Sequence, residues 1–165
     1  MFPGAGALPG GLQALAAARA SPRHAARGAG GTAGLAARAE RIGFVEGAEW
    51  AEDAVGTNAP GTAVALGRPL QIYAGEHFIR PVHPWSCSAA PVRDPDTGAV
   101  IGVIDLTGGD HIAAPHALAL VRATVAAAEA ELRLLRLRGV LPATPRRGRR
   151  PRGRGWRYWH ATGHC

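Results

Sequence analysis

The residues most able to do chemistry in this chain are a cysteine, several histidines and a few isolated acids. Cys87 lies in a strand-like run, where its thiol could contact a ligand or act as a redox centre. A cysteine that packs as a small hydrophobic side chain fits the same position. The other cysteine is the C-terminal Cys165, so no resolving thiol lies near Cys87 in sequence. A cysteine-dependent reductase is therefore an alternative function that lacks a partner thiol.

Four histidines and two nearby acids invite a metal-binding interpretation. They are His77, His83, His111, His116, Glu76 and Asp105. Their spacings match no recognised ligand pattern, and two of the four histidines stand beside a Pro. The sequence therefore predicts neither a metal nor another cofactor, and we expect no catalysis.

Asp105 stands out because it interrupts the otherwise apolar run Ala99–Leu106. A charge on a half-buried strand needs a partner, so we expect it to pair with an Arg or to reach solvent at the strand end. Aromatic side chains around the middle strands would either close an apolar cavity over a small molecule or pack as core. The candidate pocket residues are Asn58, Tyr73, Phe78, Trp85, Cys87 and Asp105.

Helical spacing predicts two short helices before these residues. The first contains Leu35, Ala39 and Ile42 and stops at Gly43. The second covers Ala59–Leu66, with Thr57 or Asn58 as its cap, Pro60 in its first turn and Gly67 as its stop.

Extended runs and one clear turn predict an antiparallel sheet. The runs are Leu70–Ala74, Ser86–Val92 and Ala99–Leu106. Asp94–Gly98 (DPDTG) combines Pro, Asp and Gly, which favour a tight turn. We therefore expect Cys87–Val92 to pair with Val100–Leu106.

A long helix is predicted over Ala114–Leu137. Its apolar positions recur every three or four residues and are Leu118, Val121, Val125, Ala128, Leu132 and Leu135. One apolar face fits packing on a sheet or on a second copy of the same helix. A homodimer through this helix is therefore expected.

The two ends of the chain differ from its middle. Residues 1–33 are rich in Ala, Gly, Pro and Arg, so we expect weak order there, or an Ala-rich helix between Gly11 and Arg27. Residues 133–165 contain 10 Arg and no acid, whereas residues 1–132 contain 9 Arg and 12 acids. From residue 138 onward the Arg/Gly/Pro-rich tail is expected to be disordered and to bind nucleic acid nonspecifically. No apolar stretch predicts a signal peptide or a membrane span, so the chain is expected to be cytoplasmic.

Five motifs in the middle of the chain together resemble the sensory GAF domain of acetoin-type, sigma-54-dependent activators and related actinobacterial regulators. The motifs are Glu40–Gly47 (ERIGFVEG), Glu52–Ala63 (EDAVGTNAPGTA), Glu76–Phe78 (EHF), Trp85–Pro91 (WSCSAAP) and Gly102–Gly108 (GVIDLTG). They occur in the family's order.

The resemblance implies an α+β fold in which helices flank a central antiparallel sheet, with a pocket for a small effector on one face. It also implies dimers and a transcriptional output. Residues 34–137 would form this domain, incomplete at its N-terminus because residues 1–33 show no apolar strand. No Walker motif or helix-turn-helix pattern follows Leu137, so the output module is expected outside this chain. The alternatives are a nucleic-acid-associated protein acting through the basic tail and a GAF-fold methionine sulfoxide reductase.

Overall fold

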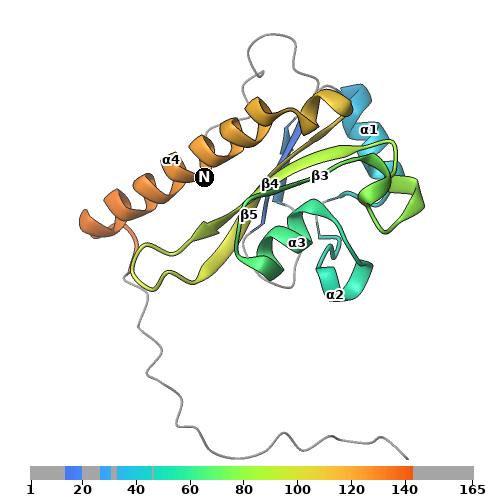
Figure 1. The fold of residues 1–165 in the computed structure, drawn as a ribbon. Helices are drawn as coiled ribbons and strands as arrows, with labels where there is room; N and C mark the ends of the chain where they lie inside the picture. The colour runs from blue at the N-terminus through green and yellow to red at the C-terminus, as the bar shows by residue number, and fades with distance from the viewer. Residues whose placement is uncertain (1–13, 20–26, 31–32, 46, 143–165) are drawn as a thin grey trace, which may run out of the picture.

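The computed structural model describes residues 14–19, 27–30, 33–45 and 47–142. These residues form an α+β fold in which helices pack against one antiparallel sheet, as predicted (Figure 1). The sheet order is β2-β1-β5-β4-β3. Its strands are β1 (Ala14–Arg19), β2 (Arg27–Gly30), β3 (Leu70–Ile72), β4 (Ser86–Arg93) and β5 (Val100–Gly108). The helices are α1 (Ala33–Arg41), α2 (Glu52–Val55), α3 (Ala59–Leu66) and α4 (Pro115–Leu137), with short 3-10 turns η1 (Ala74–Glu76), η2 (Arg80–Val82) and η3 (Asp110–Ala113).

The predicted central hairpin is confirmed. β4 and β5 are antiparallel along their length, with Cys87 opposite Thr107 and Val92 opposite Gly102. At the turn, the side chain of Asp94 accepts hydrogen bonds from the backbone N–H groups of the two residues after Pro95, each at 3.0 Å. Gly98 takes a positive φ of 70°, which glycine adopts without a steric penalty. The acid and the glycine therefore have the roles that the turn sequence indicated.

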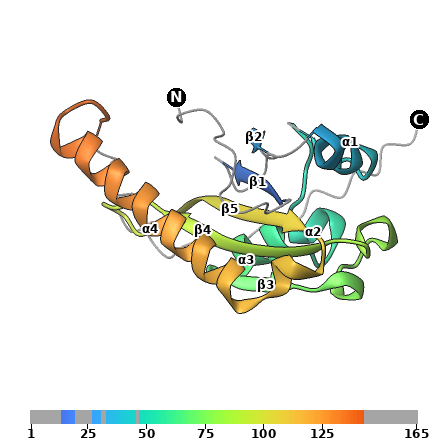
Figure 2. The ribbon, with the colours of Figure 1, turned by 90° about the horizontal axis from the view of Figure 1, so that it is seen from above.

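The expectation that residues 1–33 contain no strand is wrong. The sheet continues beyond β5 through β1 and β2 (Figure 2). The described residues between Gly11 and Arg27 therefore form a strand and not a helix. β1 pairs with β5 over six residues, from Ala14 opposite Gly108 to Arg19 opposite Val103. Alanine is the best helix former, but its advantage over most residues is below about 1 kcal/mol each, and the backbone groups on this side of β5 need partners. Tertiary pairing therefore overrides local propensity here.

α4 covers one face of the sheet. It buries Ala117, Val121 and Val125 against Leu106 and Ile112. The other predicted stripe positions are Leu118, Ala128, Leu132 and Leu135, and each is partly buried. The predicted helix and its sheet-facing stripe are therefore confirmed. No helix in the described part of the chain combines the length and the apolar character that a membrane span requires.

α3 covers the opposite face. Its Ala59 and Ala63 pack on Ile72, Cys87 and neighbouring strand residues. The α3 cap is Asn58, whose Oδ1 accepts a hydrogen bond from the Gly61 backbone at 2.8 Å. A Cβ on Gly61 would lie 2.3 Å from the carbonyl oxygen of Trp50, so this helix start tolerates only glycine.

A third cluster joins α1 to the loops beyond the sheet. Its buried members are Leu35, Ala39, Phe44, Trp50, Val82 and Trp85. Phe44 and Trp50 meet edge to face at 5.2 Å between ring centroids, and the guanidinium of Arg38 lies 5.0 Å from the Trp85 ring centroid. Such cation–π and edge-to-face contacts favour the observed ring orientations.

Candidate functional site

A buried polar chain lies on the α3 face of the sheet. Alternation along β5 sends Asp105 and Thr107 to the face that also carries Val103. The hydroxyl of Thr107 donates a short hydrogen bond to Oδ2 of Asp105. Cys87 Sγ lies 3.3 Å from Thr107 Oγ1. Either the thiol or the hydroxyl can be the donor in this contact.

Asp105 does not fit either alternative expected from the sequence. It is 0% exposed, and it pairs with no Arg among the described residues. Its Oδ1 atom has no hydrogen-bond partner there. Burial raises the pKa of Asp105 to about 7, and the Thr107 hydrogen bond offsets part of that rise. The expectation fails because Asp105 sits in a central strand, between Ala17 of β1 and Ala89 of β4, rather than at a strand end.

The Cys87 thiol is protonated in this setting. Burial raises its pKa well above the ordinary value, and the nearby Asp105 raises it further, while the Thr107 hydrogen bond lowers it. A thiolate is the nucleophilic form, so this group is a poor nucleophile. The thiol could instead form van der Waals and weakly polar contacts with a ligand.

The remaining candidate pocket residues lie elsewhere. Trp85 is buried in the α1 cluster. Asn58 is occupied in capping α3, and its Nδ2 donates to the Gly56 carbonyl at 2.7 Å. Tyr73 and Phe78 are 47% and 74% exposed. The structure therefore brings together Cys87 and Asp105 of the predicted set, with Asn58 at the start of the helix that covers them.

Phe78 lies against the loop that precedes α3. A Cβ on Gly56 would fall 2.5 Å from the Phe78 ring, and Gly56 has a φ of 73°. The Phe78 backbone N–H donates to the carbonyl of Thr57 at 2.9 Å. This ring fixes the α2–α3 turn from outside.

Three buried hydroxyl residues were not predicted as site residues, namely Ser86, Ser88 and Thr107. Thr107 stands two residues after Asp105, and this spacing on a strand was the available signal. Ser86 has a buried Oγ with no partner among the described residues. An unpaired hydroxyl is less costly than an unpaired carboxylate, so Asp105 remains the more unusual group.

Two of the four histidines are held by backbone carbonyls. His77 is buried, and its Nδ1 lies 3.0 Å from the carbonyl oxygen of Ala74, while His83 Nε2 lies 3.0 Å from the carbonyl oxygen of His77. Burial lowers the pKa of His77. Within the described ranges, no three His, Cys, Asp or Glu side chains form a group that could hold a metal ion.

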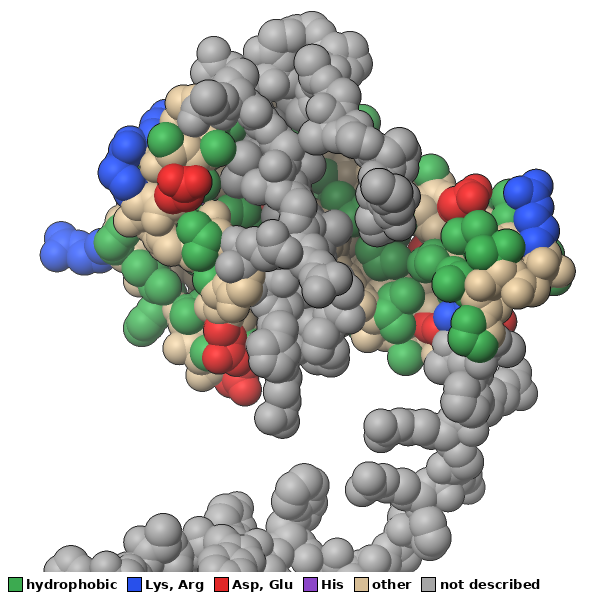
Figure 3. All heavy atoms as spheres, turned by 180° about the vertical axis from the view of Figure 1, so that it is seen from behind, with side chains coloured by type: hydrophobic (Ala, Val, Ile, Leu, Met, Phe, Trp, Pro, Cys, Tyr) green, Lys and Arg blue, Asp and Glu red, His purple; other side chains and the backbone are tan. Residues whose placement is uncertain are grey.

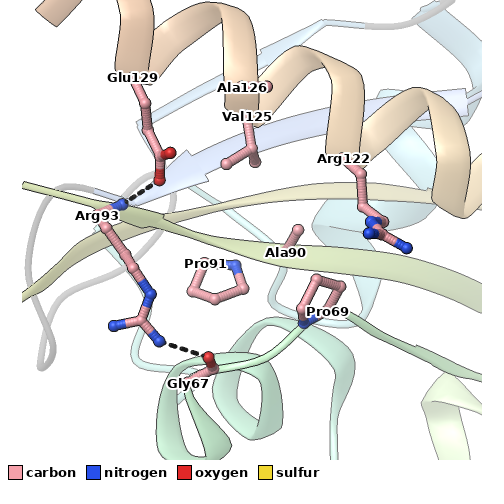
Figure 4. Close-up of a pocket in the computed structure, with 9 residues that line it drawn as sticks. All are labelled: Gly67, Pro69, Ala90, Pro91, Arg93, Arg122, Val125, Ala126 and Glu129. Carbon is pink, nitrogen blue, oxygen red and sulfur yellow. Dashed lines mark hydrogen bonds between the residues drawn. The ribbon is translucent and has the colours of Figure 1, made fainter. Parts of the chain in front are cut away.

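A separate hollow of about 250 Å³ lies between α4 and the edge of β4 (Figure 4). Val125 and Pro91 are among the apolar residues that line it, and Arg93, Arg122 and Glu129 are its charged residues. None of the pocket residues predicted from the sequence lines this hollow.

Comparison with known proteins places the chain in a family. Residues 31–131 match the family described as MimR, N-terminal domain. A 47.3 kDa protein from the thcA 5' region of Rhodococcus erythropolis is 60% identical over 105 residues, which cover 64% of this chain and 24% of that protein. The acetoin dehydrogenase operon transcriptional activator AcoR of Bacillus subtilis is 49% identical over 94 residues, covering 57% of this chain and 15% of AcoR. The chain thus spans about a quarter or less of these relatives.

The fold has a solved counterpart. The crystal structure of the E. coli DhaR(N)–DhaL complex matches with a TM-score of 0.71 and 21% identity, covering 78% of this chain and 43% of that one. The resemblance to the sensory domain of acetoin-type activators is confirmed by the family match and the relatives. The chain belongs to the MimR N-terminal domain family, the sensory region of bacterial transcriptional activators.

Proposed function

We propose that this domain is a non-enzymatic sensor whose small-molecule effector binds on the α3 face of the sheet, at Asp105, Thr107 and Cys87. The observation that carries the proposal is Oδ1 of Asp105, a fully buried carboxyl oxygen without a partner among the described residues. Leaving a buried polar atom unsatisfied costs roughly 1–3 kcal/mol, more when it is charged. A ligand that donates a hydrogen bond to Oδ1 would recover that cost.

The names of the relatives suggest the effector's chemical class. They include activators of an acetoin dehydrogenase operon and a propane 2-monooxygenase operon, and a regulatory protein of a glycerol metabolism operon. Acetoin, glycerol and the alcohols derived from propane are small oxygenated molecules. We therefore propose a neutral hydroxyl compound of about three or four carbons, whose O–H donates to Asp105 while its carbon skeleton contacts Cys87.

Space for such a molecule would come from a shift of α3. This helix faces the polar chain with methyl side chains, Ala59 and Ala63, so a small outward movement would separate it from Cys87 without dislodging a large side chain. Binding would then favour the conformation in which α3 stands further from the sheet.

The non-enzymatic assignment rests on the chemistry of Cys87 and on the relatives. A buried, protonated thiol without a neighbouring cysteine among the described residues does not suit a sulfoxide reductase. The relatives are named as transcriptional activators or regulators, which also motivates a cytoplasmic location. If Cys87→Ala abolished a measurable reduction of methionine sulfoxide, the reductase alternative would replace this assignment.

Two ties connect the site strands to α4 and would carry the signal. The carboxylate of Glu129 accepts the backbone N–H of Arg93 at 2.7 Å, near the end of β4. Arg136 pairs with Asp94 at 2.6 Å and with Asp96 at 2.5 Å. A change in the β4–β5 hairpin would therefore move the C-terminal half of α4.

A second copy of the chain is the partner that we propose for α4. An exposed stripe follows heptad spacing along this helix, distinct from its buried stripe. Its members are Leu120, Ala123, Ala127, Ala130, Leu134 and Leu137. Leu134→Glu should shift a dimer toward monomer in sedimentation velocity, whereas Leu66→Glu, at an exposed leucine of α3, should not. Equal behaviour of the two variants would remove the α4 interface.

Nucleic-acid binding through the basic tail is the competing proposal. It is motivated by the 10 Arg and no acid of residues 133–165, whose predicted disorder lies outside the described residues from 143 onward. Figure 3 shows acidic, basic and hydrophobic side chains of the described residues on both sides of the grey atoms. Deleting residues 139–165 should abolish salt-sensitive binding to DNA and leave effector binding unchanged.

The effector proposal is tested by thermal unfolding of the full chain with a panel of acetoin, 2-propanol and glycerol. A ligand that binds only the folded state raises the melting temperature. The shift should occur with at least one compound, disappear in Asp105→Asn and persist in Asp110→Asn, an exposed acid outside the site. A shift that survives in Asp105→Asn would refute the placement of the site.

A further inference from the structure

The hollow beside α4 opens because two prolines end a strand ladder. β3 and β4 pair as far as Leu70 opposite Ala89. Extending this register by one residue places Pro69 opposite Ala90. Extending it by two residues places Arg68 opposite Pro91 of β4. Proline has no N–H to donate, so the two chains separate there. β4 continues to Arg93 with β5 alone, and the separated edge forms one wall of the hollow.

α4 supplies the other wall and its charged groups. Figure 4 shows Arg122 and Glu129 projecting from α4 toward β4 at opposite ends of the hollow, with Val125 between them. The carboxylate of Glu129 accepts the backbone N–H of Arg93. The guanidinium of Arg93 donates to the carbonyls of Gly98 at 2.8 Å and Gly67 at 2.6 Å. Glu129 and Arg93 are therefore held in place by contacts within the protein.

Arg122 differs from these two groups. No described residue forms a hydrogen bond or an ion pair with its guanidinium, although it borders the hollow. The charged lining as a whole has two Arg and one Glu, so it favours an anion. A planar guanidinium matches a carboxylate with two parallel hydrogen bonds.

We propose that this hollow binds a small aliphatic carboxylate. Its carboxylate would pair with Arg122, and its short hydrocarbon part would lie on Val125, Pro91 and Pro69. The volume of about 250 Å³ is below the ~300–1,000 Å³ typical of drug-sized sites, which restricts the ligand to a few carbons. This site lies across the sheet from Asp105 and goes beyond the effector proposal, because it concerns an acid rather than a neutral hydroxyl compound.

The occupant would touch three elements at once. The lining comes from the end of α3 at Gly67, from β4 at Ala90 and from α4 at Ala126. A bound carboxylate would therefore hold α4 against the β4 edge, close to the tie between Glu129 and Arg93. This gives the second ligand a means of biasing the position of the helix.

The test is an NMR titration of the full chain with isovalerate, a branched aliphatic acid. Saturable shifts should appear at the backbone amides of Val125 and Ala126. Isovaleramide, which keeps the hydrocarbon part without the charge, should bind at least about tenfold more weakly, because charge-assisted hydrogen bonds are the stronger class. Acetate, which keeps the charge without the hydrocarbon part, should also bind more weakly.

Three variants test whether isovalerate occupies this hollow. Arg122→Gln should weaken isovalerate binding by at least about tenfold. Arg133→Gln removes an exposed Arg of the same helix that does not line the hollow, and it should leave binding unchanged. Ala126→Phe should fill the hollow and abolish binding while the chain remains folded by circular dichroism.

The outcome is independent of the effector proposal. Asp105→Asn should leave isovalerate binding unchanged, so a failure at one site does not imply a failure at the other. The inference is overturned if no saturable binding is seen at tens of millimolar isovalerate, or if Arg122→Gln and Arg133→Gln bind equally well.

Discussion

The two faces of the sheet differ in how completely their buried polar side chains are hydrogen-bonded. On the α4 face, Ser88 donates to the Ile112 carbonyl at 2.7 Å and accepts from Gln71 at 3.0 Å. Gln71 also donates to the Ala114 carbonyl at 3.1 Å, so this group joins β3, β4 and the start of α4. On the α3 face, the polar chain from Cys87 ends at a carboxyl oxygen of Asp105 with no partner among the described residues.

We interpret this difference as a division of roles, in which the α4 face stabilises the fold and the α3 face binds the effector. The α4 face buries the large apolar side chains of Leu106, Ile112, Val121 and Val125, and Ser88 and Gln71 are hydrogen-bonded there, so that only the neutral Ser86 hydroxyl on this face lacks a partner among the described residues. The α3 face keeps a carboxyl group whose desolvation is not compensated, next to small side chains that leave room for adjustment. An incompletely satisfied buried group is a reason to look for a ligand.

The largest effect that would sharpen the comparison is the pH dependence caused by Asp105. Its pKa is raised to about 7 in the folded state, from an ordinary 3.8. Between pH 3.8 and about pH 7, Asp105 is protonated in the folded chain and ionised in the unfolded chain. The free energy of unfolding therefore falls as the pH rises through this window, and Asp105 causes no further change above it. Asp105→Asn should remove a loss of about 4 kcal/mol between about pH 4 and pH 8.

Urea unfolding of both chains across this range measures the effect. Asp110→Asn, at an exposed acid, is the matched control. If the wild-type chain and Asp105→Asn show parallel pH profiles, Asp105 is not the uncompensated group that distinguishes the α3 face.

The α4 face should respond to a loss of packing rather than to pH. Ile112 of η3 is fully buried against α4, and Ile112→Ala should destabilise the chain by about 3 kcal/mol, the combined cost of lost burial and a cavity. Urea unfolding at pH 5 and pH 8 should give the same loss at both. A loss that depends on pH would show that the two faces are not independent.

The ties between the hairpin and α4 should give a smaller effect. Asp94→Ala removes two hydrogen bonds to the turn backbone and the acceptor for Arg136, and should destabilise the chain by about 2 kcal/mol. In an effector titration, this variant should still bind at the α3 face while the response of the α4 amides is reduced. An unchanged α4 response would remove the proposed route from site to helix.

The smallest expected effect concerns the α3 start. Asn58→Ala removes the helix cap and should cost about 1 kcal/mol in thermal unfolding. Because α3 covers the polar chain, effector affinity should fall as well. Asn58→Asp, which keeps the capping acceptor, should restore most of the stability. Equal stability of the two variants would contradict the capping role.

Local patterns were sufficient for most of the fold. Ala59–Leu66, the β4–β5 hairpin and the long helix were predicted because each carries its own caps, turn residues or periodicity. β1 was not predicted, since alanines in Ala14–Arg19 favour helix locally and only pairing with β5 makes them a strand. Its position depends on a partner almost ninety residues away in sequence.

The candidate site was predicted only where a residue carries a signal in its local sequence. Asp105 stood out in sequence because a charge interrupts an apolar run, and Cys87 because of its residue type. Their meeting through Thr107 depends on the β4–β5 register, which places Cys87 opposite Thr107. Tyr73 and Phe78 follow or lie between short elements, so their apolar character did not reveal that they face outward. The hollow beside α4 depends on Pro69 and Pro91 lying next to the same end of the β3–β4 ladder, which no local pattern encodes.

The most direct measurement of the central claim is an NMR titration of the isotope-labelled chain with the compound that raises its melting temperature. We predict that the side-chain carboxyl resonance of Asp105 and the amides of Cys87 and Thr107 shift first and saturate together, while the methyl groups of Ile112 and Val121 follow only weakly. Saturating shifts at Ile112 and Val121, with an unchanged Asp105 carboxyl, would contradict a sensor site on the α3 face.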